Sequence, residues 1–141
     1  MKTTKISEQI KSLVIDLLKN VNGLKIEDYI LNNCHILLDN TNDIVGTISY
    51  EKYDKLAIIR YFVFKRNIEY KDLLLLYNSL EDELKEINII NSLAIINSDE
   101  VREVFTYLGF NQIDKNKVYF DETIFSKTAY KDNDVYIKKI I

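Results

Sequence analysis

The sequence predicts one α+β domain, in which a mixed, mostly antiparallel sheet carries helices on both faces. Three observations predict this class. Short segments rich in β-branched and aromatic residues are typical of strands. Longer segments repeat apolar residues every three or four positions, as amphipathic helices do. The chain has 141 residues, without an internal repeat or a low-complexity linker, so we expect residues 1–141 to form a single domain.

Two helices are expected at the start of the chain. The segment 6–18 spaces its apolar residues as a helix does, with charged and amide residues between them. Ser7 is the predicted N-cap, and the polar segment 20–23 ends the helix. A shorter helix is expected over about 26–31. The apolar positions of the first helix are Ile6, Ile10, Leu13, Val14, Leu17 and Leu18.

Three strands follow these helices. The segments 34–39 and 44–53 are strongly apolar, and the turn 40–43 between them predicts a hairpin. A second tight turn at 53–55 leads into 56–64, an apolar run suited to a central strand. Since tight turns connect these strands, each should run antiparallel to its neighbour.

The second half of the chain alternates helices and strands. Apolar residues at helical spacing predict a long helix over 68–86, followed by a strand at 90–96. Because a helix connects 56–64 to 90–96, those two strands should be parallel. Asn97-Ser98-Asp99 caps the next helix, and Gly109 follows its last residue, where a left-handed conformation favours glycine. The remainder predicts strands at about 110–113, 118–120 and 135–140.

Composition excludes several classes of protein. The formal net charge is −3, so no overall positive field favours nucleic acid or an anionic membrane. No segment approaches the 18 or so apolar residues of a membrane span, so we expect a cytoplasmic protein without a membrane partner. Lysines crowd the C-terminal segment, where we interpret them as solvated edge residues. They are Lys115, Lys117, Lys127, Lys131, Lys138 and Lys139.

One cysteine, Cys34, excludes an intrachain disulfide and cannot form a zinc site alone. Alternation along a strand sends Cys34 and His35 to opposite faces. The pair therefore predicts a packed cysteine beside an exposed or hydrogen-bonded histidine, and not a nucleophile or a metal ligand set. We find no P-loop, no dinucleotide-binding glycine fingerprint and no metal cluster in the sequence.

The order of these elements resembles that of the GNAT superfamily of acetyl-CoA-dependent N-acetyltransferases. Three segments carry the resemblance, which covers about residues 34–141: DIVGTISY (43–50), RYFVFKR (60–66) and SDEVREVFTYLGF (98–110). The closing YLGF is the most specific of these features. The resemblance implies acetyl-CoA as cosubstrate and the amine of a small molecule or peptide as acceptor. It also leaves a homodimer open, because edge strands in this superfamily often pair between subunits.

The resemblance implies a loop of the form Arg/Gln-x-x-Gly-x-Gly/Ala that holds the CoA diphosphate at a helix N-terminus. Arg66 matches the first position of this loop, and Glu69 and Lys71 occupy the two glycine positions. A carboxylate at Glu69 should repel a diphosphate, and Lys71 would partly offset this repulsion. Arg66, Asn67 and Lys71 are therefore the expected contacts of the diphosphate.

Other positions complete the implied site. The resemblance places the pantetheine arm in the splay between the strands 56–64 and 90–96, where it would pair with backbone groups of Phe62, Val63 and Phe64. Asn97 or Ser98 would also bond to this arm. The family's tyrosine, which protonates the departing thiolate, aligns with Phe105, which has no proton to donate. Tyr107 lies about 200° away around the helix and should face elsewhere.

Glu51 is the one candidate general base, since it lies near the place where some members of the superfamily carry a catalytic glutamate. A surface carboxylate at the end of a hairpin strand is the interpretation that we favour for it. Two functions stay open from the sequence. The first is an N-acetyltransferase with an atypical cofactor loop, and the second is a GNAT-fold binding or regulatory module that has lost CoA binding and catalysis.

Overall fold

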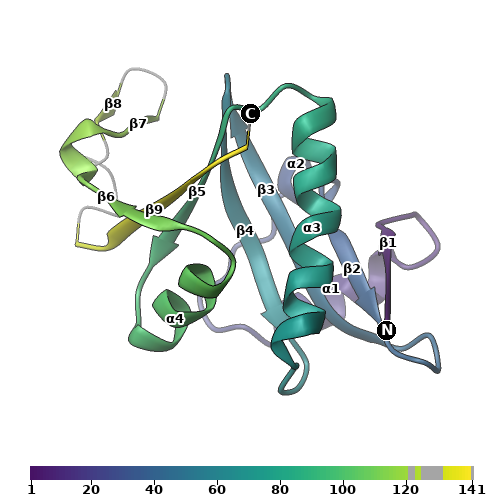
Figure 1. Ribbon diagram of the computed structural model, residues 1–141. Helices are drawn as coiled ribbons and strands as arrows, with labels where there is room; N and C mark the ends of the chain where they lie inside the picture. The colour runs from purple at the N-terminus through teal and green to yellow at the C-terminus, as the bar shows by residue number, and fades with distance from the viewer. Residues whose placement is uncertain (121–122, 125–131, 141) are drawn as a thin grey trace. The chain divides into compact units, whose positions relative to one another are not determined.

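The computed structural model describes residues 1–120, 123–124 and 132–140, and it confirms the predicted fold class (Figure 1). Seven strands form a mixed sheet in the order β1-β2-β3-β4-β5-β9-β6, and β7 and β8 pair separately. The strands are β1 (Lys2–Lys5), β2 (His35–Leu38), β3 (Ile44–Tyr53), β4 (Leu56–Phe64), β5 (Asn91–Ile96), β6 (Asn111–Ile113), β7 (Tyr119–Phe120), β8 (Thr123–Ile124) and β9 (Asp134–Lys139). The helices are α1 (Lys11–Lys19), α2 (Asp28–Leu31), α3 (Tyr70–Glu86), α4 (Asp99–Tyr107) and the 3₁₀ turn η1 (Lys115–Lys117).

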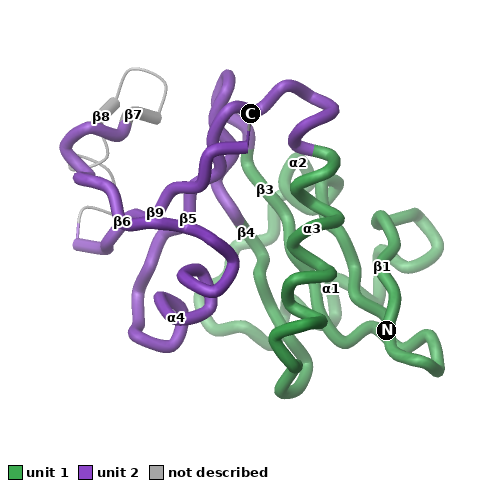
Figure 2. The backbone as a smooth tube through the Cα atoms, viewed as in Figure 1, with its two compact units in different colours: residues 1–51, 60–83 green, residues 52–59, 84–141 purple. Residues whose placement is uncertain are grey.

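The chain divides into two compact units (Figure 2). The first contains Met1–Glu51 and Arg60–Glu83, and the second contains Lys52–Ile59 and Leu84–Ile141. β3 and β4 each begin in one unit and end in the other. Each unit has its own core and is described by itself below.

In the first unit, helices cover both faces of the strands. Cys34 and Ile36 pack in a core with Val14 of α1 and Ile30 of α2. His35 points to the other face, where its Nε2 lies 3.3 Å from Oε1 of Glu83 in α3. Figure 1 shows the same arrangement, with α3 in front of the strands and α1 and α2 behind them. The predicted separation of Cys34 from His35 is therefore confirmed.

The N-terminal segment differs from its prediction. β1, which the sequence did not predict, pairs antiparallel with β2 from Lys2↔Leu38 to Lys5↔His35. The amide of Ile6 continues this pairing by donating to the carbonyl of Cys34. The helix therefore begins only at Lys11, and its N-cap is Ile10, without a side-chain hydrogen bond. Ser7 as N-cap was wrong, because the sheet edge extends to Ile6 and a turn follows, in which the Ile10 amide donates to the carbonyl of Ser7.

The second unit holds the parallel pair and the C-terminal strands. β4 pairs parallel with β5 from Leu56↔Asn91 to Ile58↔Leu93, as predicted, and β9 pairs antiparallel with both β5 and β6. The core of this unit gathers apolar side chains from these strands and from the segment after η1. Its buried members are Ile58, Leu93, Val118 and Val135.

Several local predictions in the second unit are confirmed and others shift by a few residues. Ser98 caps α4 by accepting from the amide of Val101, and Gly109 has φ 96°, the left-handed conformation expected after a helix. The final strand is Asp134–Lys139. The sequence did not predict β8. Of the C-terminal lysines, Lys127 and Lys131 lie outside the described residues.

No helix in the described parts of the chain is both long and apolar enough to cross a membrane.

Gly46 provides a test of how β3 packs. A Cβ atom at this position would lie 2.5 Å from Cδ1 of Phe64, so we expect Gly46→Ala to lower the free energy of unfolding by about 1–3 kcal/mol through overpacking. Urea unfolding of Gly46→Ala, Phe64→Leu and the double variant measures the coupling between the two positions. The double variant should lose less free energy of unfolding than the sum of the losses in the two single variants. Strict additivity would contradict the contact.

Candidate functional site

The last residues of β4 are set apart by a left-handed residue within the strand, Tyr61. Tyr61 has φ 50°, a conformation that is rare for a residue with a side chain. Side chains in a regular strand alternate between faces. Arg60 and Tyr61 nevertheless both reach the α2 face. Arg60 bonds Glu51, which also accepts from Tyr29 of α2. Tyr61 bonds Lys25 and Glu27, just before α2. The strand therefore contains a bulge here.

Hydrogen bonds hold this bulge in place. The Tyr61 hydroxyl donates to the carbonyl of Lys25 and accepts from the amide of Glu27, each at 2.8 Å. The Thr47 hydroxyl donates to the carbonyl of Tyr61 at 2.7 Å. Beyond the bulge, the rings of Phe62 and Phe64 pack edge to face with centroids 5.1 Å apart. The parallel ladder to β5 ends earlier, at Ile58, and Phe62–Phe64 are the last residues of β4.

The loop after β4 delivers the chain directly into a helix N-terminus. The amide of Lys65 donates to the carbonyl of Val45 and fixes the exit of the strand. α3 then begins at Tyr70, and the carbonyl of Glu69 accepts from the amides of Asp72 and Leu73. The first amides of a helix have no partner within it and carry the positive end of its dipole. Such an end of a helix favours an anion.

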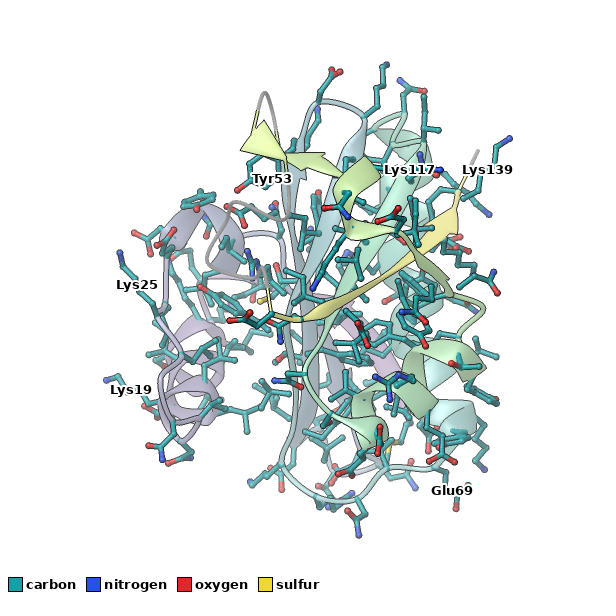
Figure 3. All side chains as sticks on the ribbon, turned by 90° about the vertical axis from the view of Figure 1, so that its left-hand side faces the viewer. Lys19, Lys25, Tyr53, Glu69, Lys117 and Lys139 are labelled. Atoms are coloured by element: carbon teal, nitrogen blue, oxygen red, sulfur yellow. The ribbon has the colours of Figure 1, made fainter. Side chains whose placement is uncertain are left out.

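Charged side chains surround this N-terminus. Arg66 has a half-exposed side chain, and its Nη2 lies 3.4 Å from Oδ2 of Asp39. Glu69 and Lys71 form an ion pair at 3.4 Å, with side chains 74% and 76% exposed, and Figure 3 shows Glu69 pointing outwards from the ribbon. The carboxylate of Glu69 therefore lies in solvent beside a cation. Water and Lys71 both weaken the repulsion that the sequence predicted.

Asp39 is a member of this site that sequence reasoning missed. Its Oδ1 accepts from the Thr41 amide, the Thr41 hydroxyl and the Asp43 amide at 2.7–3.1 Å. These bonds, with a smaller contribution from Arg66, lower the pKa of Asp39 to about 2. The signal in the sequence was an aspartate two residues before a threonine in a turn, a pattern that predicts local capping but not a partner 27 residues away.

Glu51 is buried, and the expectation of an exposed carboxylate was wrong. Its Oε1 accepts from Nε and Nη2 of Arg60 at 3.1 and 3.0 Å, and its Oε2 accepts from the Tyr29 hydroxyl at 2.9 Å. Hydrogen bonds to Glu27 and Glu51 raise the pKa of Tyr29, since they stabilise its neutral form. A proton acceptor role for Glu51 therefore requires that one of these donors be exchanged for the substrate's.

Asn97 and Ser98 belong to the second unit, whereas the other residues predicted for the site belong to the first unit. Ser98 caps α4 with its Oγ, and both residues are exposed.

Phe105 is buried and packs edge to face against Phe110, with centroids 5.0 Å apart. Tyr107 is 43% exposed, so the two rings face different sides of α4, as predicted.

A second polar cluster lies on the α3 face of the first unit. Glu83 accepts from Lys5 and from the Tyr50 hydroxyl, and His35 Nε2 lies 3.3 Å from the same carboxylate. Burial lowers the pKa of His35, while Glu83 opposes this shift. Within the described residues no group of three or more His, Cys, Asp or Glu side chains is arranged to hold a metal ion.

Solved structures that share this fold include acetyltransferases. A GNAT-family acetyltransferase from Staphylococcus aureus Mu50 matches with a TM-score of 0.71 at 19% identity, covering 99% of both chains. A Mycobacterium tuberculosis protein in complex with CoA matches with a TM-score of 0.77 at 12% identity, covering 100% of both chains.

A third match is longer than this chain. N-acetylglutamate synthase from Neisseria gonorrhoeae, complexed with coenzyme A and L-arginine, matches with a TM-score of 0.73 at 13% identity. The match covers 98% of this chain and 32% of the synthase, so the chain spans about a third of that protein's length. No protein-family model and no curated protein matches the sequence. The structural matches establish the fold.

The pKa of Asp39 makes a testable difference to acid stability. The folded-state pKa of about 2 lies below the ordinary value of about 4, so Asp39 stabilises the fold above about pH 4. This contribution is lost as the pH falls towards 2. We expect Asp39→Asn to lose less stability than the wild type between about pH 5 and pH 2.5 in urea unfolding. A carboxyl titration of Asp39 by NMR with a midpoint near pH 4 would contradict this.

Proposed function

We propose that this chain, which has the GNAT fold, is an N-acetyltransferase that uses acetyl-CoA to acetylate the amine of a small molecule or peptide. One observation carries the proposal. β4 turns left-handed at Tyr61 and then leads, through the loop that holds Arg66, directly to the N-terminus of α3. In this arrangement the last residues of β4 would meet a pantetheine arm, and the positive helix terminus would meet a diphosphate, in sequence order.

The residues of the loop fit such a ligand. Arg66 offers a guanidinium that can hold two phosphate oxygens, and Asn67 is exposed beside it. Glu69 lies in solvent and pairs with Lys71. Three basic residues (Lys65, Arg66 and Lys71) are accompanied by three acidic ones (Asp39, Glu69 and Asp72), so the local formal charge is zero. We therefore expect binding that depends on backbone amides and Arg66 more than on a general positive field.

Acetyl-CoA would supply the acyl group as a thioester, which the acceptor nitrogen attacks with loss of the CoA thiol. In this proposal the backbone of Phe62, Val63 and Phe64 pairs with the pantetheine arm. Asn97 and Ser98 were the other contacts predicted for this arm, and the Ser98 hydroxyl already caps α4. Glu51, or a water molecule, takes the proton of the attacking amine.

A second function is a binding module without catalysis, and Phe105 is the observation that favours it. Its ring is buried against Phe110 and has no proton to donate. A chain with this fold that binds neither acetyl-CoA nor CoA would belong to this second class.

Isothermal titration with acetyl-CoA and with CoA separates the two functions. We expect micromolar dissociation constants for the wild type. Absence of binding at about 1 mM ligand corresponds to less than about 4 kcal/mol of association free energy, and that outcome would exclude the transferase. An amine panel then identifies the acceptor by the release of free thiol.

The glycine positions provide a second test. Glu69→Gly with Lys71→Gly should tighten CoA binding by about three- to tenfold, because both side chains leave the approach to the α3 amides. Glu69→Gln is the matched control, since it removes the charge and keeps the bulk. Equal gains in both variants would assign the obstacle to charge. No gain in the double glycine variant would show that the diphosphate does not bind at this loop.

A further inference from the structure

The β2–β3 turn and the loop after β4 are joined by an ion pair between two residues distant in sequence. Asp39 stands at the start of the turn and Arg66 in the loop after β4, and both belong to the first unit. Figure 2 shows the two connections at the same end of this unit. Topology explains their proximity, because β3 begins where β4 ends, and the Lys65 amide donates to the carbonyl of Val45.

The carboxylate of Asp39 is rigidly held before it meets Arg66. Three donors from its own turn converge on Oδ1, and the Asp39 amide donates to the carbonyl of Asp43. The second oxygen, Oδ2, is left for Nη2 of Arg66 at 3.4 Å. The side chain of Asp39 is only 15% exposed, whereas that of Arg66 is 53% exposed. The Asp39 carboxylate, which its turn holds in place, therefore pairs with the longer and more exposed side chain of Arg66.

We propose that Asp39 is a positioning residue, which orients the Arg66 guanidinium for the phosphate groups of the acyl donor. This inference rests on the proposed function. Arginine has five N–H donors in a planar fork, and the contact with Asp39 uses one end of that fork. The remaining donors stay available to an anion. A free arginine would lose more rotamer entropy on binding than one that is already oriented.

Asp39 also carries a negative charge, which opposes the binding of a phosphate. Two features reduce this opposition. Three donors of the turn bond to one oxygen of the carboxylate, and the guanidinium of Arg66 faces the other. Asp39 thus has two opposite effects on CoA binding: its charge repels the phosphate, and its contact with Arg66 orients the guanidinium. If orientation is the larger effect, loss of Asp39 weakens CoA binding.

Asp39→Asn is the variant that isolates the contact. The asparagine Oδ1 can still accept from the donors of the turn, while an amide NH₂ replaces the oxygen that faces Arg66. We expect the dissociation constant for CoA to rise by about three- to tenfold in Asp39→Asn, and to rise at least as much in Arg66→Ala. In the double variant, the loss should be no greater than that in Arg66→Ala alone.

Thr41→Val is the matched control, since it removes one donor to Asp39 and leaves the Asp39–Arg66 pair intact. Its CoA affinity should stay within about twofold of the wild type. An equal loss in Thr41→Val would assign the effect to the turn and overturn the proposal. Unchanged or tighter CoA binding in Asp39→Asn would also overturn it. So would a loss that persists in the Arg66→Ala background.

A measurement on the free protein makes the result independent of the ligand. NMR relaxation of the Arg66 Nε–Hε group should show a lower order parameter in Asp39→Asn than in the wild type. If the wild type binds CoA and Arg66→Ala weakens it, a neutral Asp39→Asn overturns only the positioning role. If the wild type binds neither CoA nor acetyl-CoA, the proposed function fails and the positioning role fails with it.

Discussion

The left-handed conformation of Tyr61 within β4 is the constraint on which the candidate site depends. A left-handed conformation at a tyrosine is costly, on the order of 1–2 kcal/mol, so the surrounding structure must hold it. Three hydrogen bonds do so, two at the hydroxyl and one at the carbonyl of Tyr61. The side chain is buried in the core that α1 and α2 form. The helices on that face therefore fix the backbone that the cofactor would meet.

This constraint explains why the site is arranged along one continuous segment. The bulge interrupts β4, the Lys65 amide returns the chain to β3, and α3 begins five residues later. Backbone for pairing, a guanidinium and a helix N-terminus follow one another without a distant element between them. The turn that contains Asp39 is the exception, and it is brought to the same end because β2, β3 and β4 are neighbours in the sheet.

The sequence predicted the regular parts of the fold well, because their physical signals are local. The bounds of β3 and β4 agree with the apolar runs and turns that predicted them, and Ser98 and Gly109 mark the ends of α4 as expected. β1 was missed because Lys2–Lys5 is polar, and its strand conformation comes from pairing with β2. Tertiary hydrogen bonding overrode local pattern there, and it displaced the start of α1 as well.

The site was predicted less completely, since its geometry depends on contacts between distant residues. The position of Arg66 could be read from its place after the strand, but its partner Asp39 could not. Glu51 was expected at the surface and is instead buried between Arg60 and Tyr29. No periodicity shows which of two successive side chains a bulge will turn to the same face. The exception to alternation at Tyr61 places its side chain on the face that Arg60 also reaches.

Phe105 affects the rate of the chemical step, whereas Glu69 and Lys71 affect the binding of the acyl donor. A missing general acid costs about 10²- to 10⁴-fold in rate where the leaving group needs a proton. A thiol with a pKa of about 8.5 leaves as its anion near neutral pH, so this cost should lie at the low end of that range, with water protonating the thiolate afterwards. Loss of the diphosphate contacts has no such substitute, because every later step requires the bound donor. Whether this chain is a transferase therefore depends on the loop from Arg66 to Lys71, and only secondarily on the residue at position 105.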